Sequence, residues 1–91
     1  MNYRYHATED FWRSFYALSP EQKASVRRAW EIFKVDAFDP RLGTHKIHRL
    51  SARYRQNIYA VRIEADLRVV FMIKDQEIWS LDVGTHDLYK R

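Results

Sequence analysis

Apolar residues at helical spacing predict a first helix near the start of the chain. Thr8 can cap this helix. Its apolar positions repeat at i, i+4 and i+7, at Phe11, Phe15 and Leu18. Residues 3–6 alternate in character and predict a short strand before the helix. The pattern therefore indicates a strand that leads directly into a helix.

A capping box marks the start of a second helix. Ser19 is followed by Pro20 and, three residues after the serine, by Gln22, which can bond back to the cap. The helix should end before Asp36, because residues 39–43 contain an Asp-Pro pair and a glycine. Its predicted buried stripe is Val26, Ala29, Trp30 and Phe33, and its outward basic residues are Lys23, Arg27, Arg28 and Lys34.

Strand signals dominate the rest of the chain. Strands are predicted at residues 44–50, 58–64, 67–73 and 78–83. Residues 51–57 are polar and are expected to form a mobile loop. The order strand, helix, helix and antiparallel meander predicts a single α+β domain over residues 1–91, with the helices packed on one face of the sheet.

The central hairpin has a register that its apolar pattern dictates. Its apolar residues share one face only if Ile63 pairs with Leu67, which leaves residues 64–66 as a three-residue turn. This register places Arg62 directly opposite Arg68 on the other face. Like charges in that position destabilise a sheet by roughly a few tenths of a kcal/mol, so an anion between them is expected. The alternative is that the two acidic residues of the turn neutralise the arginines.

Composition indicates a small protein whose core needs no covalent crosslink. Hydrophobic residues make up 46% of the 91 residues and aromatic residues 15%, which is enough for one core. The absence of cysteine excludes disulfides and thiolate zinc sites and fits a reducing compartment. The sequence has no apolar run as long as a membrane span and no signal-peptide stretch at its start. We therefore expect a cytoplasmic protein with no membrane partner.

Positive charge is concentrated in the middle of the chain, although the net charge is only +4. Tyr54 and Tyr59 are interleaved with the basic residues, as in surfaces that bind a polyanion. The alternative is that the arginines keep an exposed sheet edge soluble. The basic residues of this segment are Arg41, Lys46, Arg49, Arg53, Arg55, Arg62 and Arg68, against Glu64 and Asp66.

Four stretches combine basic, acidic and aromatic residues with histidine. They are Lys46-Ile-His48-Arg-Leu50, Tyr59-Ala-Val-Arg62, Asp66-Leu-Arg68-Val-Val-Phe and Val83-Gly-Thr-His86-Asp-Leu-Tyr89. With the element order of nearly the whole chain, they resemble the RelE/ParE superfamily of bacterial toxin–antitoxin systems, whose toxins are mostly messenger-RNA endonucleases. The resemblance implies a translation-inhibiting toxin that cleaves messenger RNA without a metal or other cofactor.

Features of two branches of this superfamily are mixed in the sequence. The match to RelE-like members, which surround the RNA with basic strands and a C-terminal tyrosine, consists of Lys46, Arg62, Arg68 and Tyr89. The match to the histidine-using, YafQ-like members consists of His48, Asp66 and His86. Arg62 stands where that branch has its hairpin histidine, and Ser51-Ala52 replaces an expected glycine. These departures leave the general base undecided.

The resemblance also implies a mechanism, in which the 2′-hydroxyl of the RNA attacks phosphorus and leaves a 2′,3′-cyclic phosphate and a 5′-hydroxyl. His86 is then the general acid, and His48 or Asp66 takes the hydroxyl proton. Arg62 and Arg68 hold the nonbridging phosphate oxygens. The other RNA contacts are stacking by Tyr89 and charge from Lys46, Arg49, Arg53 and Arg55.

The expected partners are messenger RNA, free or on the ribosome, and a cognate antitoxin. A free RNA nuclease is lethal to its own cell, and a cationic cleft attracts an acidic peptide. No metal is expected: His45 and His48 have H-x-x-H spacing, but three residues apart on a strand they face opposite sides.

Two other functions stay open on this scaffold. One is a ParE-like poison of DNA gyrase, which generally lacks the catalytic tail, so His86 and Tyr89 favour the nuclease. The other is an inactive relative that only binds nucleic acid or an antitoxin. Fold alone does not decide between them.

Overall fold

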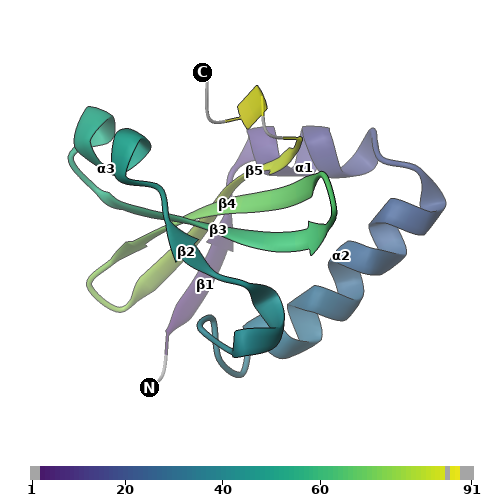
Figure 1. Cartoon of the computed structure of the whole chain (residues 1–91), viewed down its shortest axis with the longest axis horizontal. Coiled ribbons are helices and arrows are strands. Elements are labelled where there is room, and N and C mark those ends of the chain that lie inside the picture. The colour runs from purple at the N-terminus through teal and green to yellow at the C-terminus, as the bar shows by residue number, and fades with distance from the viewer. Residues whose placement is uncertain (1–2, 86, 89–91) are drawn as a thin grey trace.

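The computed structural model describes residues 3–85, 87 and 88, which form a five-stranded sheet with helices on both faces (Figure 1). The strand order is β1-β5-β4-β3-β2, with bounds Arg4–Ala7 (β1), His45–Lys46 (β2), Asn57–Glu64 (β3), Leu67–Lys74 (β4) and Glu77–Gly84 (β5). The helices are Glu9–Tyr16 (α1), Pro20–Phe33 (α2) and His48–Tyr54 (α3), and Pro40–Leu42 form a 3-10 turn (η1). β1 is parallel to β5, and the other pairs are antiparallel. The predicted α+β fold with its meander is confirmed.

Both predicted helix starts are confirmed. The Thr8 hydroxyl accepts a hydrogen bond from the Phe11 amide at 3.1 Å and donates one to the Leu81 carbonyl at 2.7 Å, which ties α1 to β5. At α2, the two reciprocal bonds between Ser19 and Gln22 measure 3.1 and 3.0 Å. Side-chain caps of this kind each stabilise a helix by roughly 1 kcal/mol.

α1 and α2 cover one face of the sheet, and the apolar residues of that face are buried beneath them (Figure 1). Burial of large apolar side chains stabilises the fold by about 1.5–3 kcal/mol each. The buried residues of this layer are Phe11, Phe15, Val26, Phe33, Ala37 and Leu42 from the helical half and Val61, Leu67, Val69, Phe71, Ile78 and Val83 from the strands.

Trp30 departs from the predicted buried stripe of α2, because its side chain is 39% exposed. Its ring meets the edge of the Tyr5 ring on β1, with 5.2 Å between centroids. The prediction that Trp30 belongs to the buried stripe was wrong, because the indole lies at the margin of the helical layer. Val26 and Phe33 are the buried residues of α2.

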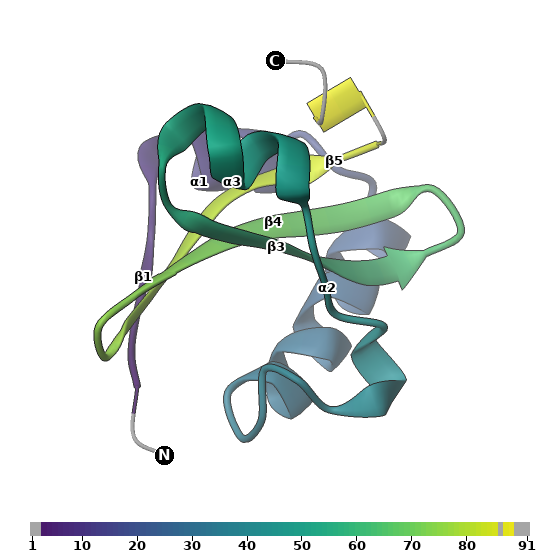
Figure 2. The ribbon, with the colours of Figure 1, turned by 60° about the vertical axis from the view of Figure 1, so that its left-hand side comes forward.

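The opposite face of the sheet is covered by α3 (Figure 2). The buried side chain of Leu88 packs in the same layer. The predicted strand at residues 44–50 and mobile loop at residues 51–57 were wrong, because β2 has only two residues and α3 follows it. Ile47 and Leu50 are one helical turn apart and bury their side chains together. The two predicted helices lie on one face, as expected, and α3, which the sequence did not predict, covers the other.

The β3–β4 hairpin has most of the predicted register. Arg62 is paired with Arg68, as predicted. Glu64, rather than Ile63, pairs with Leu67, and a bulge between Arg62 and Glu64 takes up the extra residue. The bulge leaves Ile63 partly buried beside the helices, so the predicted three-residue turn shortens to residues 65–66.

Within residues 3–85, 87 and 88, no helix has both the length and the apolar character needed to span a membrane.

Candidate functional site

A row of four residues crosses the sheet on the side away from α1 and α2. Arg62 on β3 pairs with Arg68 on β4, which pairs with Gly84 on β5. On the other side, a Cβ atom placed on Gly43 would lie 3.7 Å from the Arg62 Cβ atom. Glycines therefore flank the two arginines, which we call the arginine row. Leu88 packs over Gly84 at one end of the row, and the end at Arg62 and Gly43 is exposed.

The two arginines differ in their surroundings. Arg68 is only 9% exposed, and its Nη1 donates to the Ala65 carbonyl at 3.3 Å and lies 3.9 Å from Asp66 Oδ1. Arg62 is exposed, and none of the acidic residues in the described part of the chain forms an ion pair with it. The alternative of local neutralisation therefore applies to Arg68 at most, and Arg62 is available to an anion.

The chain turns back over the sheet after β5. The Leu88 amide donates to the Thr85 carbonyl at 3.1 Å, and the Leu88 side chain is buried against the α3 side of the sheet. A Cβ atom on Gly84 would lie 3.3 Å from Leu88 Cδ2, so glycine permits this close return. The predicted general acid His86 and stacking residue Tyr89 lie outside the described residues, and their roles stay predictions.

Lys46 and His48 are not on the arginine row. Lys46 pairs with Tyr59, whose ring stacks on Phe71 beneath α1 and α2. Directly paired residues share a face, so Lys46 lies on the face of the sheet opposite the arginine row. His48 begins α3 instead of continuing a strand, which removes the strand-based argument against an H-x-x-H pair. Both residues line a polar hollow of about 510 Å³ at the β2 edge, with Ser51, Ala52, Arg55, Gln56 and Asn57.

The remaining predicted RNA contacts lie along α3. Arg49 and Arg53 are exposed one turn apart, and the Arg53 guanidinium lies 5.5 Å from the centre of the Tyr54 ring. Arg55 ends the helix with φ 54°, a left-handed conformation that is uncommon for a residue other than glycine. Asp66 is exposed in the hairpin turn. Among the residues that the structure describes, no three His, Cys, Asp or Glu side chains gather as metal ligands.

Arg41 does not contribute to the arginine row. Asp39 accepts hydrogen bonds from the Arg41 amide at 2.9 Å, from Nε at 3.0 Å and from Nη2 at 2.9 Å. The hydrogen bonds from the Arg41 side chain have the largest effect, and together with the bond from the Arg41 amide they lower the pKa of Asp39 to about 2. Asp39 is also the N-cap of η1, which ends at the left-handed Gly43 shortly before β2.

His45 was not identified from the sequence as a neighbour of the arginine row and was considered only as a metal ligand. His45 pairs with Ala60, one row away from Arg62, and its Nδ1 lies 3.0 Å from the Gly43 carbonyl. One signal for this position was available in the sequence. Residues 43 and 45 are two apart in a predicted strand, so their side chains share one face.

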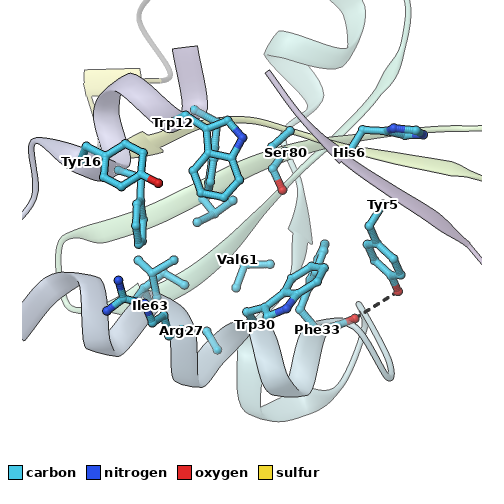
Figure 3. Close-up of a pocket in the computed structure, with 16 residues that line it drawn as sticks. Tyr5, His6, Trp12, Tyr16, Arg27, Trp30, Phe33, Val61, Ile63 and Ser80 are labelled. Carbon is cyan, nitrogen blue, oxygen red and sulfur yellow. Dashed lines mark hydrogen bonds between the residues drawn. The ribbon is translucent and has the colours of Figure 1, made fainter. Parts of the chain in front are cut away.

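An apolar groove of about 450 Å³ lies between α1 and α2, with the sheet as its floor (Figure 3). Trp12 and Tyr16 of α1 line one wall and are 46% and 66% exposed. Arg27 and Trp30 of α2 line the other wall, and Val61 and Ile63 are part of the floor. The sequence did not predict this groove, because helical spacing alone does not show how far two helices diverge.

Three solved structures illustrate the fold's relatives. RelE in the archaeal RelE–RelB complex from Pyrococcus horikoshii has a TM-score of 0.71 and 15% identity, covering 93% of this chain and 96% of that one. The match to the Escherichia coli DinJ–YafQ toxin–antitoxin complex has a TM-score of 0.75 and 8% sequence identity, and it covers 97% of each chain. The match to a metal-bound toxin from Helicobacter pylori has a TM-score of 0.63 and 13% sequence identity, and it covers 97% of this chain and 98% of that one.

At the level of sequence, comparison with family models and with curated proteins finds no match. The structural likeness nevertheless extends over almost the whole length of each chain. The protein therefore has the fold of RelE- and YafQ-type toxins, as the resemblance in sequence implied.

Proposed function

We propose that this protein is the toxin of a toxin–antitoxin system and cleaves messenger RNA without a metal. The observation that carries the proposal is the direct pairing of Arg62 with Arg68 across the sheet, with Arg62 exposed beside Gly43. Two guanidinium groups placed side by side bind the nonbridging oxygens of a phosphate and stabilise the charge that develops there. The likeness of fold to RelE and YafQ supports the toxin role.

In the proposed reaction, the 2′-hydroxyl attacks phosphorus while the arginine row holds the phosphate. The 2′-oxygen loses its proton to a base, the bond from phosphorus to the 5′-oxygen breaks, and that oxygen receives a proton from an acid. His86 is the proposed acid, at the tail that follows β5. The resemblance offers His48 or Asp66 as the base, and the basic residues of α3 extend the surface for RNA.

The partner proposed for the groove between α1 and α2 is an amphipathic helix of the antitoxin. The groove offers exposed aromatic rings for apolar side chains that repeat at helical spacing, and Arg27 on its wall suits an acidic residue. Two of the similar solved structures are complexes of a toxin with its antitoxin. Groove and arginine row lie on opposite faces of the sheet, so binding and cleavage can be altered separately.

Expression in bacteria with the product of the adjacent gene tests the role. We expect the chain alone to stop growth and translation, and its co-expressed antitoxin to restore both. W12E should weaken the complex while RNA cleavage survives, whereas R62E should do the reverse. Normal growth with the chain alone would contradict a toxin, and inhibition of purified gyrase without RNA cleavage would favour the gyrase poison.

A further inference from the structure

His45 lies beside the arginine row because of the register of β2. Its partner Ala60 precedes Arg62 by two residues on β3, and residues two apart on a strand project to the same side. Ala60 is fully buried in the layer beneath α3, so this side is the one that also carries Arg62 and Arg68. The short β2 therefore places an exposed imidazole on the face of the paired arginines, one strand row from Arg62.

A hydrogen bond to the preceding turn fixes which nitrogen of this imidazole carries the proton. His45 Nδ1 lies 3.0 Å from the Gly43 carbonyl oxygen. A carbonyl can only accept, so Nδ1 must donate, and in the neutral ring Nε2 then has a free lone pair. Gly43 itself adjoins Arg62, since a Cβ atom on Gly43 would lie 3.7 Å from the Arg62 Cβ atom. This is the tautomer that a general base acting through Nε2 requires.

We propose that His45 is the general base that takes the proton of the 2′-hydroxyl, an inference that rests on the proposed RNA cleavage. In this step Nε2 gains the proton, the 2′-oxygen bonds to phosphorus, and the bond to the 5′-oxygen breaks. The leaving oxygen receives its proton from the separate acid. The arginine row holds the phosphate one strand row away from the imidazole.

The two bases that the family resemblance offers are less well placed. His48 begins α3 and lines the hollow at the β2 edge with Lys46, whose strand partner Tyr59 lies on the other face. Asp66 lies in the hairpin turn, where its carboxylate is 3.9 Å from Arg68. The Asp66 side chain is exposed there, beyond the paired arginines at the end of the hairpin.

Single-turnover cleavage of RNA tests this assignment. His45→Gln keeps an amide that can donate to Gly43 but cannot accept and hold a proton, and His45→Ala removes both functions. We expect both variants to bind RNA normally and to cleave about 10²–10⁴-fold more slowly. Arg28→Gln on the outward face of α2 removes a surface charge and is the matched control, with wild-type cleavage expected. His48→Ala, measured in parallel, should lose less than His45→Gln.

A substrate with sulfur in place of the 5′-oxygen separates base from acid, because a thiolate leaves without a proton. We expect His86→Ala to recover on this substrate and the His45 variants to stay slow. Cleavage by His45→Gln within threefold of wild type, or its recovery on the sulfur substrate, would overturn the assignment and leave the nuclease intact. No cleavage by the wild-type protein would instead refute the proposed function itself, and the assignment with it.

Discussion

Arg62 and Arg68 are direct partners in the β3–β4 ladder, yet Arg62 is exposed and Arg68 is buried, with only 9% of its surface exposed. The buried member is held by the hairpin turn, through the Ala65 carbonyl at 3.3 Å and Asp66 at 3.9 Å. The exposed member adjoins Gly43. We infer that the two arginines have different roles. Arg68 is held in a fixed position to bind the phosphate, and the exposed Arg62 moves to contact it.

Arg68→Lys should therefore lower cleavage more than Arg62→Lys does. Lysine keeps the charge but loses the planar fork, and at Arg68 it also loses the position that the turn gives the guanidinium. We expect turnover to fall at least tenfold in Arg68→Lys, with the far-ultraviolet circular dichroism spectrum unchanged. Rates for both variants on one RNA, at one salt concentration, make the comparison. Equal rates for Arg68→Lys and wild type would reduce Arg68 to a surface charge.

The sequence predicted those elements whose signals are local. Thr8 and Ser19 carry the caps of α1 and α2, and the period of two in β3 and β4 fixed which arginines meet. α3 lacked such signals: Ile47 at its start makes no side-chain cap, and Arg55 at its end replaces the usual glycine. The sequence of its seven residues therefore predicts parts of a strand and a loop instead of a helix.

The candidate site was predictable only as far as strand alternation reaches. Arg62 and Arg68 follow from the hairpin alone. Placing His45 requires knowing that β2 ends at Lys46 and pairs in register with Ala60. The groove depends on the angle between two helices, which tertiary packing sets, so Trp12 and Trp30 looked like ordinary helical residues.

Ser51 should be a stabilising residue of α3, where the family resemblance led us to expect a glycine. Its buried hydroxyl accepts from the Ile58 amide at 2.9 Å and donates to the Ile58 carbonyl at 3.2 Å. Ser51→Ala leaves the buried Ile58 amide unpaired, while the Ile58 carbonyl keeps the bond that it accepts from the Ile47 amide at 2.8 Å. The change should lower the free energy of unfolding by about 1–3 kcal/mol. Urea denaturation measures the change. Ser25→Ala on α2, which loses only an exposed contact with Arg28, should stay within about 0.5 kcal/mol of wild type.

Gly84→Ala should disturb the tail rather than the sheet. The new Cβ atom would lie 3.3 Å from Leu88 Cδ2, which is closer than ordinary packing, and the leucine must shift. We expect a loss of cleavage of several-fold with a melting temperature within a few degrees of wild type. Gly84→Ser should behave in the same way. A fully active Gly84→Ala protein would show that cleavage does not depend on how the tail returns over β5.

Asp39 should titrate well below its usual range. Hydrogen bonds from the Arg41 side chain and backbone lower its pKa from 3.8 to about 2. A lowered pKa in the folded state means that the stabilisation is complete above about pH 3.8 and is lost as the pH falls toward 2. Carboxyl carbon shifts followed by nuclear magnetic resonance should give this midpoint. In Arg41→Ala the pKa should return toward 3.8, and an unchanged midpoint there would contradict the attribution.

The ends of the RNA products test the central claim most directly. Purified wild-type protein is incubated with messenger RNA, with and without ribosomes, in the presence of a metal chelator, and both new ends are identified. We predict a 2′,3′-cyclic phosphate on one fragment and a 5′-hydroxyl on the other, with cleavage reduced by roughly two to four decades in His86→Ala. Intact RNA under every condition, or a 5′-phosphate at the new end, would contradict the account.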